Sequence, residues 1–151
     1  MRLSRVVWDH PDAVVLREAM VAEVSAVYGS NRDYASGDGS KGIDPHTVVV
    51  TLVGYDGDVP VAQAVLRRLG DDLEIKRMYV VPEFRGMGAL SAMLIELEAE
   101  ARAQSATRVV LHTGSRQQAA IRAYERHGYT PIEIYEPYVG MPESLCFEKQ
   151  L

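Results

Sequence analysis

The sequence is poor in cysteine and in long apolar runs, the features that mark secreted and membrane proteins. It contains a single cysteine, Cys146, so an internal disulfide framework is excluded and a reduced setting fits. The first residues, MRLSRVVWDHPD, lack the apolar core of a secretory signal. No apolar run approaches the ~18–20 residues needed to span a bilayer. We therefore expect a cytoplasmic protein without a membrane segment.

An excess of positive charge is also missing. The chain has 16 Lys and Arg against 21 Asp and Glu, which gives a formal net charge of −5. Nucleic acids and anionic membranes call for a basic surface, so neither is expected as the main partner. The 151 residues, 47% of them hydrophobic, suit one domain (1–151) with an ordinary core, and neither a repeat nor a low-complexity tract interrupts it.

The hydrophobic pattern predicts an α+β domain around a mixed sheet. Three strands joined by the turns DGDV and GDD predict an antiparallel meander, and the strand–helix–strand order that follows predicts a parallel pair. Ser115 and Gln118 form an S-x-x-Q capping box, and Gly128 suits the end of that helix. Strands are expected at 3–8, 47–55, 60–69, 73–81, 108–113, 129–135 and 144–151, and helices at 10–29, 90–104 and 115–128.

A glycine-rich stretch separates the third meander strand from the second helix. Arg85, Gly86 and Gly88 stand where that helix begins. Helix N-termini carry unpaired N–H groups and the positive end of a dipole, and glycines let a ligand approach the backbone. The stretch therefore predicts a phosphate or pyrophosphate site, although a tight turn with an exposed arginine would look the same.

Common nucleotide signatures and metal signatures are absent. The G-x-G-x-x-G of dinucleotide-binding folds fails because Ala89 and Leu90 follow the glycines, and G-K-[ST] does not occur there. The four histidines show neither H-x-x-H nor H-E-x-x-H spacing, so no metal is predicted.

Two segments can be read together. Arg85, Gly86 and Gly88 are followed by Ala89 and Leu90, and about thirty residues later the chain reads AAIRAYERHGY. With these segments the chain resembles the GCN5-related N-acetyltransferase (GNAT) family. Arg85 and Gly88 match the first and fourth positions of its R/Q-x-x-G-x-G/A motif, whereas Leu90 departs from the sixth. The later segment resembles the family's A-I-x-x-Y-x-x-x-G-F/Y signature, in the right order. The order of elements resembles the family over nearly the whole chain. The resemblance implies a single GNAT-type domain with a mostly antiparallel sheet flanked by helices.

The resemblance also implies acetyl coenzyme A as co-substrate. Its pantetheine arm would pair with the strand before the glycines, its diphosphate would lie on the backbone from Gly86 to Ser91, and Gln117 stands where the family often has Asn. The implied binding residues are Met78, Tyr79, Val80, Arg85, Gly86, Met87, Gly88, Ala89, Leu90, Ser91, Gln117 and Tyr124.

Three residues are candidates for the chemistry. Tyr124 occupies the family's tyrosine position near the thioester sulfur, where its hydroxyl can protonate the leaving thiolate; the alternative is a half-buried core tyrosine. Glu74 and His112 are both candidates for the base that takes the amine's proton. The alternatives are a solvated Glu74 paired with Arg77 or Lys76, and a His112 that caps nearby backbone.

The expected function is direct acetyl transfer to a primary amine on a small molecule or peptide; the alternative is a regulator that binds coenzyme A without turnover. Tyr34, Asp44 and His46 would line the acceptor on one side and Tyr135 and Tyr138 on the other, or these are ordinary surface loops. Cys146 is expected in the core. The sequence leaves open the acceptor, the choice of base, the effect of Leu90 and whether the protein forms a homodimer.

Overall fold

The computed structural model describes residues 1–29 and 42–151. The described elements are β1 (Arg2–Val6), α1 (Pro11–Tyr28), a 3-10 helix (Pro45–Thr47), β2 (Val48–Asp56), β3 (Val59–Leu69), β4 (Asp72–Val80), a 3-10 helix (Pro82–Phe84), α2 (Ala89–Ala103), β5 (Arg108–Gly114), α3 (Gln118–Arg126), β6 (Thr130–Ile132) and β7 (Ser144–Gln150). None of the helices in these two ranges is long and apolar enough to cross a membrane.

The described strands form one sheet in the order β1-β2-β3-β4-β5-β7-β6. The meander β2–β3–β4 is confirmed, and glycines with positive φ, Gly57 and Gly70, lie in its two turns. β4 and β5 are the parallel pair, with α2 between them in the chain; the other neighbouring pairs are antiparallel. The predicted α+β class with a mostly antiparallel sheet is therefore confirmed.

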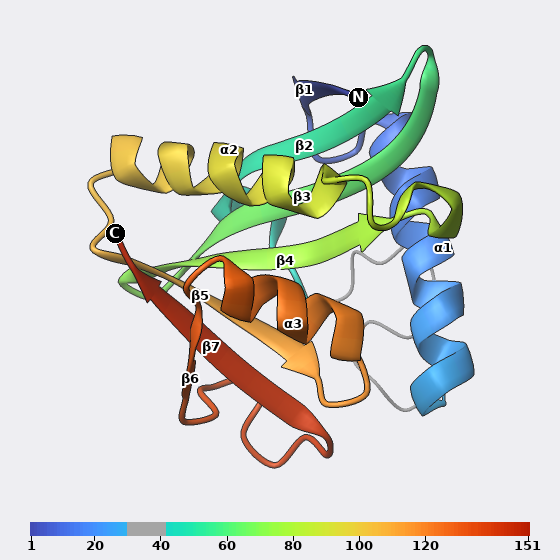
Figure 1. The fold of residues 1–151 in the computed structure, drawn as a ribbon. Helices are drawn as coiled ribbons and strands as arrows, with labels where there is room; N and C mark the ends of the chain where they lie inside the picture. Colours follow the sequence, from blue (N-terminus) through green and yellow to red (C-terminus); the bar gives the residue numbers. More distant parts are fainter. Residues whose placement is uncertain (30–41) are drawn as a thin grey trace.

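The helices cover both faces of the sheet. In Figure 1, α2 and α3 lie on one face and α1 lies on the other. The alternation of strand side chains explains this division, because successive residues point to opposite faces. Leu52 joins the core cluster that contains α2 and α3, and its neighbour Val53 joins the cluster that contains α1.

Two local predictions are wrong. The capping box does not form, because the Ser115 N–H that it needs donates instead to the Glu143 carbonyl at 2.8 Å. The helix begins at Gln118, whose side chain donates to the Ser115 carbonyl at 2.6 Å. The strand expected at 129–135 covers only Thr130–Ile132, where its pairing with β7 ends. Beyond it, the Tyr135 hydroxyl donates to Glu74 on β4 at 2.6 Å.

Gly114, at the end of β5, offers a test of how α1 is held. A Cβ at this position would overlap the phenol group of Tyr28, the last residue of α1. We expect Gly114→Ala to lower the free energy of unfolding by about 1–3 kcal/mol, the usual cost of overpacking, measured by chemical denaturation. In a Tyr28→Phe background the cost should shrink, because the hydroxyl is the nearest clashing atom. An equal cost in both backgrounds would contradict this explanation.

Candidate active site

The sheet opens between β4 and β5. The two strands pair only where Leu73–Ile75 lies opposite Val109–Leu111, although β4 continues to Val80 and β5 to Gly114. A cleft of about 780 Å³ lies where the pairing has stopped. Its walls are the free ends of both strands, the first turn of α2, α3 and the α1 segment around Met20 and Val24.

The edge of β4 that faces the cleft is left without a partner strand. Val81 donates its N–H to the Val61 carbonyl on β3, so strand alternation turns the N–H and carbonyl of Val80 toward the cleft. A bulge before this segment places Arg77 at φ 55, and the register with β3 shifts there. The Val80 carbonyl already accepts a hydrogen bond from Arg85 Nε. The cleft-side N–H has no partner strand and is available to an extended ligand with amides of its own.

The glycine stretch forms the next part of the wall. Gly86 and Gly88 have φ of 77° and 87°, and Gly88 is the N-cap residue of α2. The first helical hydrogen bond runs from the Ala92 N–H to the Gly88 carbonyl at 3.0 Å, which leaves the N–H groups of residues 89–91 without intrahelical partners. No atom lies within 4 Å of a Cβ built on either glycine, so the space in front of this backbone is open. The arrangement is suited to an anion.

Arg85 ties the glycine stretch to its surroundings. Its Nη2 lies 2.7 Å from a carboxylate oxygen of Glu23 on α1, and its Nε donates to the Val80 carbonyl at 2.9 Å. Both partners of the ion pair are partly exposed, so the pair is expected to add little to stability. The structure therefore shows Arg85 as a link between α1, β4 and the loop, and its contact with a phosphate stays a prediction.

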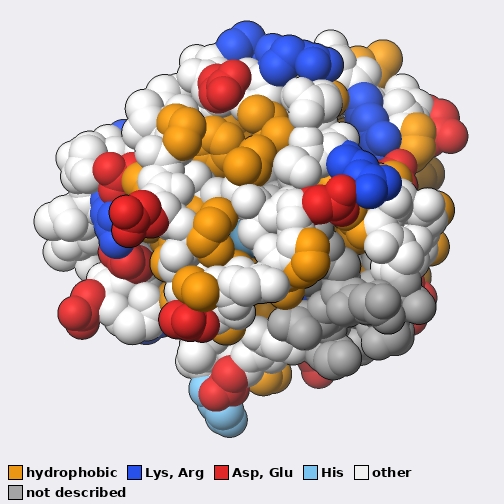
Figure 2. Space-filling view, turned by 90° about the horizontal axis from the view of Figure 1, so that it is seen from below, with side chains coloured by type: hydrophobic (Ala, Val, Ile, Leu, Met, Phe, Trp, Pro, Cys, Tyr) orange, Lys and Arg blue, Asp and Glu red, His pale blue; other side chains and the backbone are white. Residues whose placement is uncertain are grey.

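The cleft is basic within an acidic protein. Among the described residues, six Lys or Arg line it against one acidic residue, Glu23, while the whole chain has a net charge of −5. Figure 2 shows Lys and Arg side chains gathered along the upper edge of one face, with Asp and Glu scattered across it. A concave surface lined by one sign of charge concentrates ligands of the opposite sign.

Tyr124 projects from α3 into the wall of the cleft. The residue is 5% exposed, belongs to the main core cluster and packs edge-on against Tyr129 with ring centroids 5.9 Å apart. Burial raises the pKa of the Tyr124 hydroxyl, so it stays protonated at neutral pH. The ring is a core residue, and its hydroxyl carries a proton at neutral pH.

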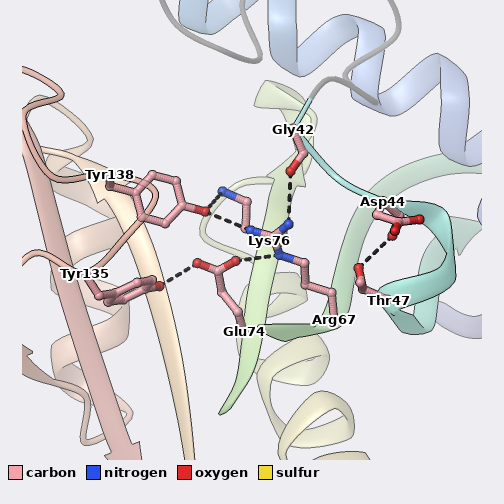
Figure 3. Close-up of polar contacts among 8 residues, drawn as sticks. All are labelled: Gly42, Asp44, Thr47, Arg67, Glu74, Lys76, Tyr135 and Tyr138. Carbon is pink, nitrogen blue, oxygen red and sulfur yellow. Dashed lines mark hydrogen bonds and ion pairs between the residues drawn. The ribbon is translucent and has the colours of Figure 1, made fainter. Parts of the chain in front are cut away.

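The two candidate bases occupy different places. His112 lines the cleft, its Nε2 is 2.9 Å from the Ser144 hydroxyl, and its ring stacks on Tyr138 with centroids 3.8 Å apart. Glu74 is fully buried and is not among the residues that line the cleft. Its carboxylate accepts from Arg67 Nε at 2.8 Å and from the Tyr135 hydroxyl at 2.6 Å (Figure 3).

The comparison with known proteins decides the family. Residues 17–129 match the model of the Acetyltransferase (GNAT) family. The chain belongs to the GNAT family. A curated IAA acetyltransferase of Azospirillum brasilense is 39% identical over 79 residues, which are 52% of this chain and 51% of that protein. An uncharacterized N-acetyltransferase of Mycobacterium bovis is 33% identical over 87 residues, 57% of this chain and 54% of that protein. The chain thus matches about half the length of these relatives.

Solved structures share the fold over its full extent. A solved structure from Klebsiella pneumoniae, which bears only the name of an acyl-CoA N-acyltransferase, has a TM-score of 0.81 at 25% identity, covering 99% of this chain and 97% of that one. The PaiA N-acetyltransferase of Thermoplasma acidophilum, solved in complex with coenzyme A, has a TM-score of 0.74 at 13% identity, covering 100% of both chains. The second likeness shows the fold alone. The expected membership of the GNAT family is confirmed.

The GNAT cleft gathers most of the residues predicted from the sequence. Among the predicted catalytic and cofactor-binding residues, Glu74 and Met87 are the two exceptions: Met87 is 72% exposed and does not line this cleft. The cleft contains Met78, Tyr79, Val80, Arg85, Gly86, Gly88, Ala89, Leu90, Ser91, His112, Gln117 and Tyr124. Their roles in binding and catalysis stay predictions.

Three of these predicted binding residues, Leu90, Ser91 and Gln117, also contact the rest of the protein or begin a helix. Leu90, at the position where the family has a small residue, packs partly against the core, and α2 begins regularly one residue earlier. Ser91 Oγ lies 2.7 Å from His127 Nε2, which links the start of α2 to the end of α3. Gln117 is the N-cap residue of α3, although its side chain makes no capping hydrogen bond.

The expectation of a solvated Glu74 paired with Arg77 or Lys76 is wrong. Glu74 is buried and its ion-pair partner is Arg67, which lies directly opposite it on β3. Nothing in the local sequence shows this partner, because the cross-strand register sets it.

The loops expected around the acceptor are only partly described. Tyr34 lies outside the described residues. Asp44 accepts from the His46 N–H at 2.9 Å and caps a 3-10 helix, so its carboxylate already has a local partner. Tyr135 and Tyr138 lie between β6 and β7 and reach the buried charges of β3 and β4. Cys146 is buried as expected, and burial raises the pKa of its thiol.

Sequence inspection missed several lining residues. Arg122 and Arg126 stand four residues apart on α3, a spacing that places them on one helical face and could have been noticed. Lys76 shares a strand with Glu74 at the two-residue spacing that puts both on one face. Within the described residues, His, Cys, Asp and Glu nowhere gather in a group of three suited to a metal.

Proposed function

We propose that this GNAT protein is an acetyl-coenzyme-A-dependent N-acetyltransferase that transfers the acetyl group directly to a primary amine. One observation carries the proposal. The unpaired edge of β4 and the N-terminus of α2, whose first N–H groups can bind an anion, follow one another in a single basic cleft. Coenzyme A has the same order of features, since its amide-containing arm is followed by a diphosphate. The family membership and the acetyltransferase names of its relatives support this proposal.

The residues of the cleft fit this co-substrate. The backbone on the cleft side of Met78–Val80 would hold the pantetheine amides, apart from the Val80 carbonyl, which accepts from Arg85. The N–H groups from Gly86 to Ser91 would hold the diphosphate. Arg122 and Arg126 add positive charge on the opposite wall. When bound, acetyl coenzyme A would supply an activated acyl group as a thioester.

The chain itself would supply three contributions. The N–H of Val80 would stabilise negative charge on the acyl oxygen during attack by the amine. Tyr124 would donate its proton to the departing sulfur. A base would take the proton of the amine, and Glu74 and His112 are the candidates that the sequence suggests. Cys146 is too buried to serve as an acyl carrier.

The alternative function, coenzyme A binding without turnover, rested on two grounds: Leu90 at the position where the family has a small residue, and the absence of a decisive base. The structure bears on the first ground. The Leu90 side chain packs against the core and α2 begins normally, which weakens the argument from Leu90. The two functions differ in thiol release. Protein, acetyl coenzyme A and a panel of polyamines, amino acids, aminated antibiotics and peptides should liberate free thiol only when an accepted amine is present. Tight coenzyme A binding with no amine-dependent thiol release would support the regulator instead.

A further inference from the structure

A cluster of buried charges lies on β3 and β4, beside the wall of the cleft. It consists of Arg67, Glu74 and Lys76, with the hydroxyls of Tyr135 and Tyr138 (Figure 3). Each of the three charged residues is at most 6% exposed. Buried charges are costly unless they are paired, so a cluster that holds two cations and one carboxylate needs an explanation.

Arg67 already satisfies Glu74. The Arg67 Nε lies 2.8 Å from one carboxylate oxygen, and the Tyr135 hydroxyl donates to the other at 2.6 Å. Arg67 also donates to the Gly42 carbonyl at 3.0 Å, which anchors the chain just after the undescribed residues. The second cation, Lys76, is therefore not required to neutralise Glu74.

Lys76 differs from Glu74 in its position. It lines the cleft, two residues before Met78 on the strand with the free edge. Its Nζ lies 2.5 Å from the Tyr138 hydroxyl and 4.5 Å from the centroid of that ring, and Tyr138 stacks on His112, which also lines the cleft. Lys76 thus connects the buried cluster with the wall of the cleft.

We propose that Lys76 is the general base of the acetyl transfer, an inference that rests on the proposed function. As the new N–C bond forms and the C–S bond breaks, a proton of the acceptor nitrogen moves to the Lys76 Nζ. Tyr124 gives its proton to the sulfur, so the products are an amide and a thiol. Water then restores the protonation states of Lys76 and Tyr124.

The surroundings of Lys76 favour its neutral form. Burial lowers the pKa of the Lys76 ammonium to about 7; Glu74 and Cys146 oppose this lowering, and Arg77 and Arg67 reinforce it. Among the described residues, the Tyr138 hydroxyl contacts the Lys76 Nζ directly, His112 stacks on Tyr138, and Tyr135 donates to Glu74. A base is active when unprotonated, so the rate should rise with pH through about 7.

Two substitutions separate a base from a structural charge. Lys76→Arg keeps a positive charge that cannot be removed near neutral pH, and Lys76→Met keeps a long side chain without any charge. We expect both variants to lower kcat by about 10²–10⁴-fold and to lose the acidic limb of the pH–rate profile. Thermal denaturation and calorimetric affinity for coenzyme A should show that each variant is folded and binds. Lys149→Met is the matched control, because this lysine pairs with Glu98 and does not line the cleft.

Glu74→Gln distinguishes the rival bases. If Lys76 is the base, removing the negative charge of Glu74 should lower the pKa of Lys76 further and move the acidic limb to lower pH. If Glu74 is the base, the limb should vanish in Glu74→Gln while Lys76→Arg keeps it. If His112 is the base, the limb should vanish in His112→Gln instead. Either of the last two outcomes would overturn the proposal.

An NMR titration of the Lys76 side chain tests the proposal without an assay of enzyme turnover. The chain contains only three lysines, Lys41, Lys76 and Lys149, so lysine side-chain NMR signals can be assigned by single substitutions. One signal should titrate near pH 7 and be missing from Lys76→Arg. A Lys76 signal with the ordinary pKa of ~10.4 would overturn the proposal without touching the proposed function. Absence of amine-dependent thiol release from the unmodified protein would overturn both.

Discussion

Tyr124→Phe should slow acetyl transfer on the order of 10²-fold near pH 7 while the fold and the affinity for coenzyme A change little. The ring would keep its place in the core cluster and its edge-on contact with Tyr129. Without the hydroxyl, the thiolate must leave unprotonated or take a proton from water. Free thiols have a pKa of ~8.5, so the missing proton matters less above that pH and the defect should shrink there.

Tyr129→Phe is the matched control for this experiment. Tyr129 is equally buried in the same cluster, but its hydroxyl donates to Glu98 at 3.1 Å and the residue does not line the cleft. Its loss should affect stability more than turnover. Steady-state rates and coenzyme A affinities of the three proteins would be compared from pH 6 to 10, a range chosen to bracket the ~8.5 of a free thiol. A Tyr124→Phe protein that keeps the wild-type rate near neutrality, with chemistry shown to be rate-limiting, would leave Tyr124 with a packing role only.

Gly88→Val should weaken coenzyme A binding by at least about tenfold, or ~1.4 kcal/mol. The φ of Gly88 is 87°, a conformation that a β-branched residue resists, so the start of α2 would have to move. A side chain there would also fill the open space in front of the unpaired N–H groups. Gly86→Val, at φ 77°, should act in the same direction. Calorimetric titration with coenzyme A measures the loss.

Gly57→Val controls for the backbone penalty. Gly57 also has positive φ and open space around its Cβ position, but it lies in the turn between β2 and β3 and does not line the cleft. This variant should lose stability and keep its affinity. An unchanged affinity in a folded Gly88→Val protein would refute the diphosphate assignment.

The elements that could be predicted from the sequence are those whose cause is local. The DGDV and GDD turns specify the meander because glycine supplies the positive φ that each tight turn needs. The capping box failed because a distant carbonyl, that of Glu143, took the N–H of Ser115. The strand expected at 129–135 failed after Ile132 because the following residues reach across to buried charges instead of continuing along β7.

The residues of the site likewise fall into those that a local motif predicts and those that only the folded structure brings together. The glycine stretch and the Tyr124 segment are contiguous motifs, and the structure places them around one cleft. The partner of Glu74 could not be predicted, because Arg67 meets it only through the register of β3 with β4. The burial of Lys76 depends on Tyr138, which lies 62 residues further along the chain. A lysine in an ordinary strand pattern gives no sign of such surroundings.

The central claim is that the acetyl group passes from acetyl coenzyme A to the amine without an acyl-enzyme intermediate. The measurement that tests it best follows an isotope-labelled acetyl group from acetyl coenzyme A. Once thiol release has identified an accepted amine, mass spectrometry of both amine and protein during turnover should find the label on the amine nitrogen. It should appear at the rate of thiol release and in no protein-bound form that is passed on to the amine. Label that reaches the amine only after first accumulating on the protein, or thiol release without labelled amine, would contradict the proposed N-acetyltransferase.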